Sequence, residues 1–398
     1  MLLFDAGPRS DDQPRRHSEG AFAFLNRVRG PVWEQCRDLL EAWHGAFPQA
    51  EQWRIARRLQ SGDDRQFSSA FWELYIHEMF RRAGWEATIE PKVPHSKNRP
   101  DFVFTNGRDA LYVEARCVYD ESDAGAAARL HAVYDRVQNI DTGAFWLAVR
   151  PNAVGSQSPP TGALRRDLAS WLSRLDPDYI EADFTSNDRE RFLWIHDDWS
   201  IEFHPLARPA STRDDPPDRA IAAYLPSSAQ WVDDIGALRA ALEDKGTKYG
   251  ALDHPFVIAL NVIRGFHDHR DTAEALFGRI GFSVNFDDPS APVAPVLSDV
   301  GYFGTPEAPR HTQVAGILLG HSIDSPAVAR AQPLYYPHPW GTASVATLDL
   351  WATVDWAEAT FESAEAAPPQ CPPHEHFGLP SNWPTGDRFP GTRRGHGH

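Results

Sequence analysis

The residues best suited to chemistry in this sequence are three carboxylates and one arginine between positions 73 and 116. Glu73 lies in a segment with helical spacing of apolar residues, and Asp101 opens a short apolar segment. Glu114 follows thirteen residues after Asp101, in an apolar run that continues to Arg116. Carboxylates, together with water and phosphate oxygens, are the ligands that Mg²⁺ prefers. These residues therefore predict a site for metal-assisted phosphate chemistry.

The spacing of the last three residues places Asp101 on one strand, and Glu114 and Arg116 on the next. Side chains alternate between the two faces of a strand, so Glu114 and Arg116 should point to the same face, and Asp101 should reach it from the next strand. A guanidinium group stays protonated and cannot act as a general base, but it can hold a phosphate through two hydrogen bonds. The alternative is structural: Asp101 begins a turn, and Glu114 pairs with Arg116.

The same residues resemble a known superfamily. A helix carries Glu73 eleven residues before Gly84, Pro100-Asp101 opens one strand, and Glu114-Ala115-Arg116 lies in the next. This pattern resembles the PD-(D/E)XK nucleases, which have the restriction-endonuclease-like fold. Three positions match that motif, whereas Arg116 stands where the family has lysine. The chain is also similar to a group of uncharacterised bacterial proteins in which that lysine is often replaced.

The resemblance implies an activity and a site. Asp101, Glu114 and Arg116 would be catalytic, and Glu73, Asp101 and Glu114 would bind Mg²⁺ or Mn²⁺. The reaction would be phosphodiester hydrolysis of nucleic acid, with DNA as the expected substrate, in an endonuclease of defence or repair. The alternative is an inactive nuclease fold that serves as a binding or scaffold protein and docks a protein partner through its second domain.

Lysine is scarce, and its positions are informative. Of 39 basic residues only four are lysines, in the pairs Lys92/Lys97 and Lys245/Lys248. Either member of the first pair is a candidate for a displaced catalytic lysine. The second pair, followed by Tyr249, would either contact phosphates or simply place positive charge near a helix C-terminus, where it is favourable.

The expected elements build an α/β protein. Apolar spacing predicts helices, and short apolar runs between turn residues predict strands. We expect helical structure over 21–59, 66–83, 123–137, 163–175 and 233–248, and strands over 85–89, 102–104, 111–118, 144–149, 192–195, 200–205, 256–262, 312–319 and 343–354.

This order predicts a mixed sheet flanked by helices in a nuclease-like domain over 21–180. A second α+β domain of unknown role is expected over 190–362. We expect disorder over 1–20 and in the proline-rich tail over 363–398.

Composition narrows the function further. The chain has 398 residues and a formal net charge of −16, which excludes a uniformly basic protein that coats DNA. Three cysteines cannot build a disulfide framework. We see no signal peptide or membrane-spanning segment, so we expect a cytoplasmic protein without a membrane partner. Cutting both strands of a duplex usually needs two active sites, so a homodimer is a further option.

Overall fold

The computed structural model divides the chain into two compact units. Unit 1 comprises residues 1–11, 20–120 and 233–388, and unit 2 comprises 12–19, 121–232 and 389–398. The structure describes residues 2–94, 96–119, 124–180, 190–213, 219–225, 234–246, 248–250, 252–263, 269–278, 280–283, 294–297, 300–343, 345, 350–354 and 366–390.

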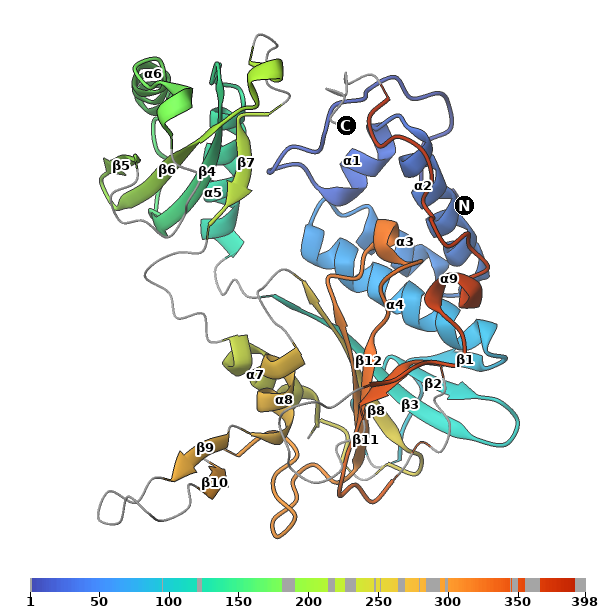
Figure 1. Cartoon of the computed structure of the whole chain (residues 1–398). Coiled ribbons are helices and arrows are strands. Elements are labelled where there is room, and N and C mark those ends of the chain that lie inside the picture. Colours follow the sequence, from blue (N-terminus) through green and yellow to red (C-terminus); the bar gives the residue numbers. More distant parts are fainter. Residues whose placement is uncertain are drawn as a thin grey trace. The chain divides into compact units, whose positions relative to one another are not determined.

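Unit 1 is built on a mixed sheet with the strand order β1-β2-β3-β8-β11-β12-β13-β14 (Figure 1). The first three strands form an antiparallel meander, and β3, β8 and β11 run parallel. A separate hairpin consists of β9 and β10. The strands of unit 1 are β1 (Glu86–Ile89), β2 (Phe102–Thr105), β3 (Ala110–Tyr119), β8 (Phe256–Ile263), β9 (Ile280–Ser283), β10 (Ala294–Leu297), β11 (Val314–His321), β12 (Leu334–Pro337), β13 (Ala352–Val354) and β14 (Ala366–Ala367).

Helices cover both faces of this sheet, with α1 to α4 on one side and α7 and α8 on the other (Figure 1). On the first side, Phe80 of α4 stacks on Phe104 of β2 with ring centroids 4.0 Å apart. On the second side, Leu238 and Leu242 of α7 pack in a core with Ile258 of β8. The helices are α1 (Ala21–Arg27), α2 (Pro31–Ala46), α3 (Gln52–Leu59), α4 (Asp64–Arg82), α7 (Asp234–Gly246), α8 (His269–Phe277) and α9 (Pro373–His376).

Local sequence explains where the N-terminal helices begin and end. The predicted helical stretch 21–59 is three helices. Gly30 adopts φ 133° and Pro31 starts α2 at its first turn, which separates α1 from α2. Phe47, which precedes Pro48, is extended and ends α2 before α3 begins. The Asp63 side chain accepts a hydrogen bond from the Arg65 amide and caps α4. Gly84 follows α4 with φ 84°, the left-handed conformation expected of a residue that stops a helix.

Unit 2 contains a second mixed sheet, with the strand order β5-β6-β4-β7. Helices α5 and α6 contribute to its core, which contains Val137, Leu168 and Phe203. Strands β5 and β6 form the predicted hairpin, and Asp197 at its turn has φ 47°. The elements are α5 (Ala124–Gln138), β4 (Phe145–Ala153), α6 (Thr161–Leu172), β5 (Phe192–His196), β6 (Trp199–Ala207) and β7 (Ile221–Tyr224).

The structure corrects the predicted domain boundaries. We expected the helix over 123–137 and the strand over 144–149 to complete the sheet of the nuclease-like domain. Instead, α5 and β4 belong to unit 2, and β3 pairs in parallel with β8, more than 130 residues along the chain. Residues 121–232, the main segment of unit 2, are therefore inserted between two segments of unit 1 and do not continue a domain over 21–180.

The predicted disorder at the two ends is also wrong for the residues that the structure describes. Leu3 and Phe4 are buried, and their amides donate to the Glu41 carboxylate at 2.8 and 2.9 Å. Near the other end, Phe377 and Trp383 are buried in unit 1. Apolar side chains within these polar segments find partners in the core. Residues 363–365 and 391–398 lie outside the described part of the chain.

Candidate functional site

The candidate site lies where β2 and β3 face α7. Tyr112 and Val118 of β3 pack into the core beside α7, and Glu114 and Arg116 have the same parity along the strand. Asp101 immediately precedes β2, which pairs with β3. The predicted common face of Glu114 and Arg116 is confirmed, and it is the face that α7 covers.

Glu114 is the most deeply buried member of the group, with 2 % of its surface exposed. The Lys245 ammonium lies 2.5 Å from its Oε1, and Lys248 lies 3.5 Å from the same atom. The Tyr249 hydroxyl donates to the other oxygen, Oε2. Glu114 therefore pairs with cations from the end of α7 and the residues after it, rather than with Arg116.

Lys245 is a cation at neutral pH. Burial by itself lowers the pKa of Lys245, but the charge of Glu114 and the hydrogen bond to it outweigh burial and raise the pKa above its ordinary value. The pKa of Tyr249 is also raised, by burial and by the nearby charge of Glu114, so its hydroxyl keeps its proton. Both groups are donors at this site.

At Asp101, burial and the neighbouring charges both disfavour the ionised form. Burial, together with the charges of Glu114 and Glu73, raises the pKa of Asp101 to about 8. Its Oδ2 accepts a hydrogen bond from the Ala115 amide at 2.8 Å, which holds the carboxyl against β3. No described residue donates a hydrogen bond to Oδ1. Asp101 is therefore a half-buried carboxyl that lacks sufficient positive charge around it.

Glu73 projects from α4, and its Oε1 lies 2.5 Å from the Arg58 guanidinium of α3. Burial raises the pKa of Glu73, although Arg58 opposes this shift. Because the charge of Glu73 also acts on Asp101, the three carboxylates share one electrostatic environment. Glu73 is nevertheless already neutralised, by an arginine that the sequence did not single out.

Arg116 forms an ion pair with Asp244 of α7, with 2.5 Å between Nη1 and Oδ2. Its side chain is 38 % exposed, and that of Asp244 is 61 % exposed. The predicted role of Arg116 at a phosphate is compatible with this exposure. An ion pair between two exposed side chains is weak, so Asp244 holds the guanidinium only loosely.

The structure places one of the two lysine pairs beside Glu114 and leaves the other pair away from it. Lys92 and Lys97, the expected sources of a displaced lysine, are exposed, and no contact joins them to Glu114 in the described part of the chain. Lys245 and Lys248 contact Glu114 instead. Their clustering in a chain with so few lysines was the sequence signal that could have assigned them.

The residues present fit a divalent cation only in part. Within the described residues, no group of three or more His, Cys, Asp or Glu side chains is arranged to hold a metal. Asp101 and Glu114 remain suitable as a pair, because Mg²⁺ binds through one or two carboxylates and completes its shell with water and phosphate oxygens. The raised pKa of Asp101 marks a position where added positive charge is favourable.

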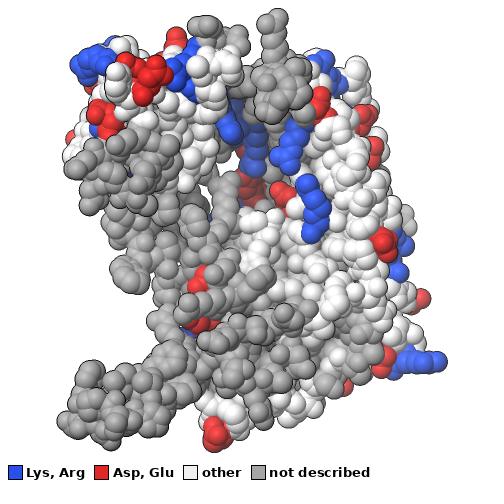
Figure 2. Space-filling model, viewed as in Figure 1, with Lys and Arg blue, Asp and Glu red and all other residues white. Residues whose placement is uncertain are grey.

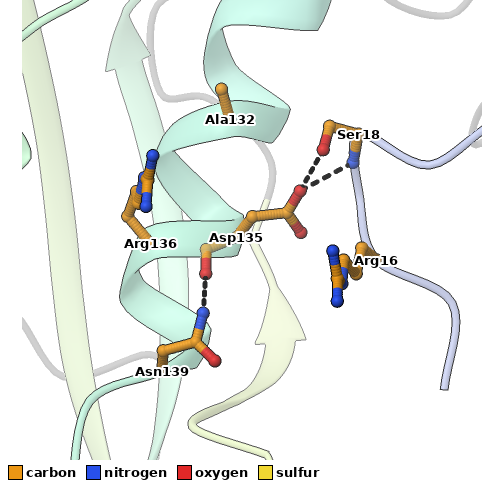
Figure 3. Close-up of a pocket in the computed structure, with 6 residues that line it drawn as sticks. All are labelled: Arg16, Ser18, Ala132, Asp135, Arg136 and Asn139. Carbon is orange, nitrogen blue, oxygen red and sulfur yellow. Dashed lines mark hydrogen bonds between the residues drawn. The ribbon is translucent and has the colours of Figure 1, made fainter. Parts of the chain in front are cut away.

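Unit 2 has a cavity of its own, which none of these residues lines (Figure 3). Asp135 of α5 accepts hydrogen bonds there from the His17 amide at 2.6 Å and the Ser18 amide at 2.9 Å. The Ser18 hydroxyl also donates to Asp135, as Figure 3 shows. Asp135 thus anchors the segment 12–19 to α5. The lining residues are Arg16, Ser18, Ala132, Asp135, Arg136 and Asn139.

Comparison with known proteins leaves the site to be interpreted from its own geometry. No protein-family model, curated protein or solved structure matches this chain. What the fold defines is an α/β protein with two mixed sheets. Among the helices of the described residues, none has both the length and the apolar character that crossing a bilayer would require.

Proposed function

We propose that unit 1 is a metal-dependent phosphodiester hydrolase of nucleic acid with a restriction-endonuclease-like core. The order of elements supports this proposal. Helix α4 precedes the antiparallel meander β1-β2-β3, and α7 then leads to β8, which lies parallel beside β3. This is a mixed sheet flanked by helices, as the resemblance to the PD-(D/E)XK nucleases implies, with unit 2 inserted after the third strand.

The contact between Lys245 and Glu114 carries the proposal. The family motif places a lysine two residues after its second acidic residue, and Arg116 stands there in this chain. Lys245 brings an ammonium group to 2.5 Å from Glu114 from another element. A lysine reaching the acidic pair from α7 would replace the one that β3 lacks.

Each of these residues would have its own role in the reaction. Asp101 and Glu114 would hold Mg²⁺ or Mn²⁺, which when bound positions water and neutralises charge on the phosphate. Lys245 stays protonated beside Glu114, so its role is to stabilise negative charge on the phosphoryl oxygens rather than to remove a proton. Arg116 is exposed enough to contact the scissile phosphate.

The test combines metal binding with cleavage. Calorimetry with Mg²⁺ and Mn²⁺ and nicking of a supercoiled plasmid should both be positive for the wild-type chain and both be lost in Asp101→Asn. Lys245→Met should bind metal but nick at least 100-fold more slowly. The matched control is Lys97→Met, an exposed lysine without a described contact to the site, which should behave as wild type. Undiminished nicking by Lys245→Met would refute the assigned role.

A second candidate function is a nuclease fold without activity that serves as a binding protein. The observation in its favour is that described donors occupy both oxygens of Glu114, at Lys245 and Tyr249. Under this function the wild-type chain would bind neither cation in the calorimeter, and Asp101→Asn would change only its stability.

A further inference from the structure

The inference concerns α3, a short basic helix beside Glu73. Its buried side consists of Ile55, Ala56 and Leu59. Its other side carries Trp53 and three arginines, Arg54, Arg57 and Arg58. Figure 2 shows Lys and Arg side chains gathered beside Asp and Glu on the side of unit 1 that α1 to α4 cover.

Two of these arginines join α3 to the candidate site. Arg58 binds Glu73 at 2.5 Å. Arg54 pairs with Glu90, whose amide donates to the Asp101 carbonyl at 2.9 Å. Helix α3 therefore contacts Glu73 directly and reaches the backbone of Asp101 through Glu90.

The remaining two residues face solvent. Trp53 has 56 % of its surface exposed, and it is the only tryptophan classed as exposed among the described side chains. Arg57 is exposed, and it forms no ion pair with a described residue. Residues four apart lie on the same side of a helix, so Trp53 and Arg57 are neighbours on α3, with their Cα atoms about 6 Å apart along the axis.

We propose that Trp53 and Arg57 form a binding site for single-stranded nucleic acid beside Glu73, on the side of the sheet that α3 and α4 cover. This inference rests on the proposed function and specifies its substrate. An exposed aromatic ring binds nucleic acid by stacking on a base, and base faces are accessible in a single strand but covered in a duplex. An arginine without an acidic partner supplies the contact to the backbone. Substrates would therefore be single strands, or duplexes with an unpaired segment, such as a single-stranded end, a gap or a region that negative supercoiling opens in a plasmid.

Binding can be measured without cleavage. Fluorescence anisotropy of labelled oligonucleotides, with the full-length chain and excess EDTA, should show tighter binding to a single strand than to a blunt duplex of equal length. Trp53→Ala should weaken single-strand binding about tenfold or more, because one stacked base contributes about that much. Trp53→Phe should retain most of the affinity. Comparing the affinities for DNA and RNA oligonucleotides of equal length would show which of the two the site prefers.

Arg57→Gln should lower the dependence of affinity on salt by close to one phosphate contact, a slope change of about 0.7 for a single strand. The matched control is Tyr179→Ala, which removes an 84 % exposed aromatic side chain from unit 2 and should leave binding unchanged. Circular dichroism of each variant checks that it is folded.

The outcomes separate this inference from the proposed function. Equal affinity for duplex and single strand, or unchanged affinity in folded Trp53→Ala, would overturn the inference even if the chain nicks plasmids. Single-strand binding that depends on Trp53, in a chain that never cleaves, would support the α3 site and refute only the hydrolytic function.

Discussion

Replacing Asp101 with asparagine should make the protein more stable. Burial and two neighbouring carboxylates raise the pKa of Asp101 from 3.8 to about 8, so its charged form is unfavourable in the folded state. The unfolded chain ionises freely at pH 7, whereas the folded chain keeps the proton. Across the roughly three pH units between 3.8 and 7, this difference destabilises the fold by up to about 4 kcal/mol. Asparagine removes the charge, and its carbonyl can still accept from the Ala115 amide.

The pH dependence follows from the sign of the shift. A carboxyl whose pKa is raised in the folded state contributes full stability below its ordinary value and loses it as pH rises through the folded value. The stability advantage of Asp101→Asn should therefore be small near pH 4, widen up to about pH 8, and stay constant above it. Because Glu73 and Glu114 share the repulsion, about 4 kcal/mol at pH 7 is an upper bound and at least ~1 kcal/mol is expected.

The assay is thermal and urea unfolding without divalent cations, from pH 4 to pH 9. A gain of 1 kcal/mol should raise Tm by about 1 °C in a chain of this size. Asp38→Asn is the matched control, since Asp38 is an exposed carboxylate on α2. A variant less stable than wild type at every pH, or an advantage that does not vary with pH, would refute the proposed electrostatic repulsion.

Three further predictions test other parts of the molecule. Lys245→Met should cost about 3–5 kcal/mol, because Glu114 loses its closest cation while buried, and adding Glu114→Gln should recover most of the loss in urea unfolding. Asp135→Ala should expose the segment 12–19 to trypsin, since the anchoring bonds to its amides are lost; an unchanged cleavage rate would contradict this role. Phe80→Ala should lower unfolding free energy by about 3–5 kcal/mol, because the ring is fully buried against β2, and a loss below 1 kcal/mol would argue against that packing.

Local patterns in the sequence predicted much of the secondary structure around the site. Apolar spacing and the stop at Gly84 identified α4, and turn residues between short apolar runs identified the meander. The alternation of strand side chains was enough to place Glu114 and Arg116 on one face. These features depend on residues a few positions apart, so the sequence itself contains them.

The partners of β3 and of Glu114 were decided by the tertiary structure. A helix and a strand follow β3 directly along the chain, yet β8 pairs with it after the inserted unit. The spacing of apolar residues marks a strand but does not specify its neighbour, because pairing depends on contacts between distant segments. For the same reason Lys245, 131 residues from Glu114, appeared in the sequence only as an isolated pair with Lys248. Residue types along the chain indicated which chemistry to expect, and the packing of α7 against β3 determined which lysine lies beside Glu114.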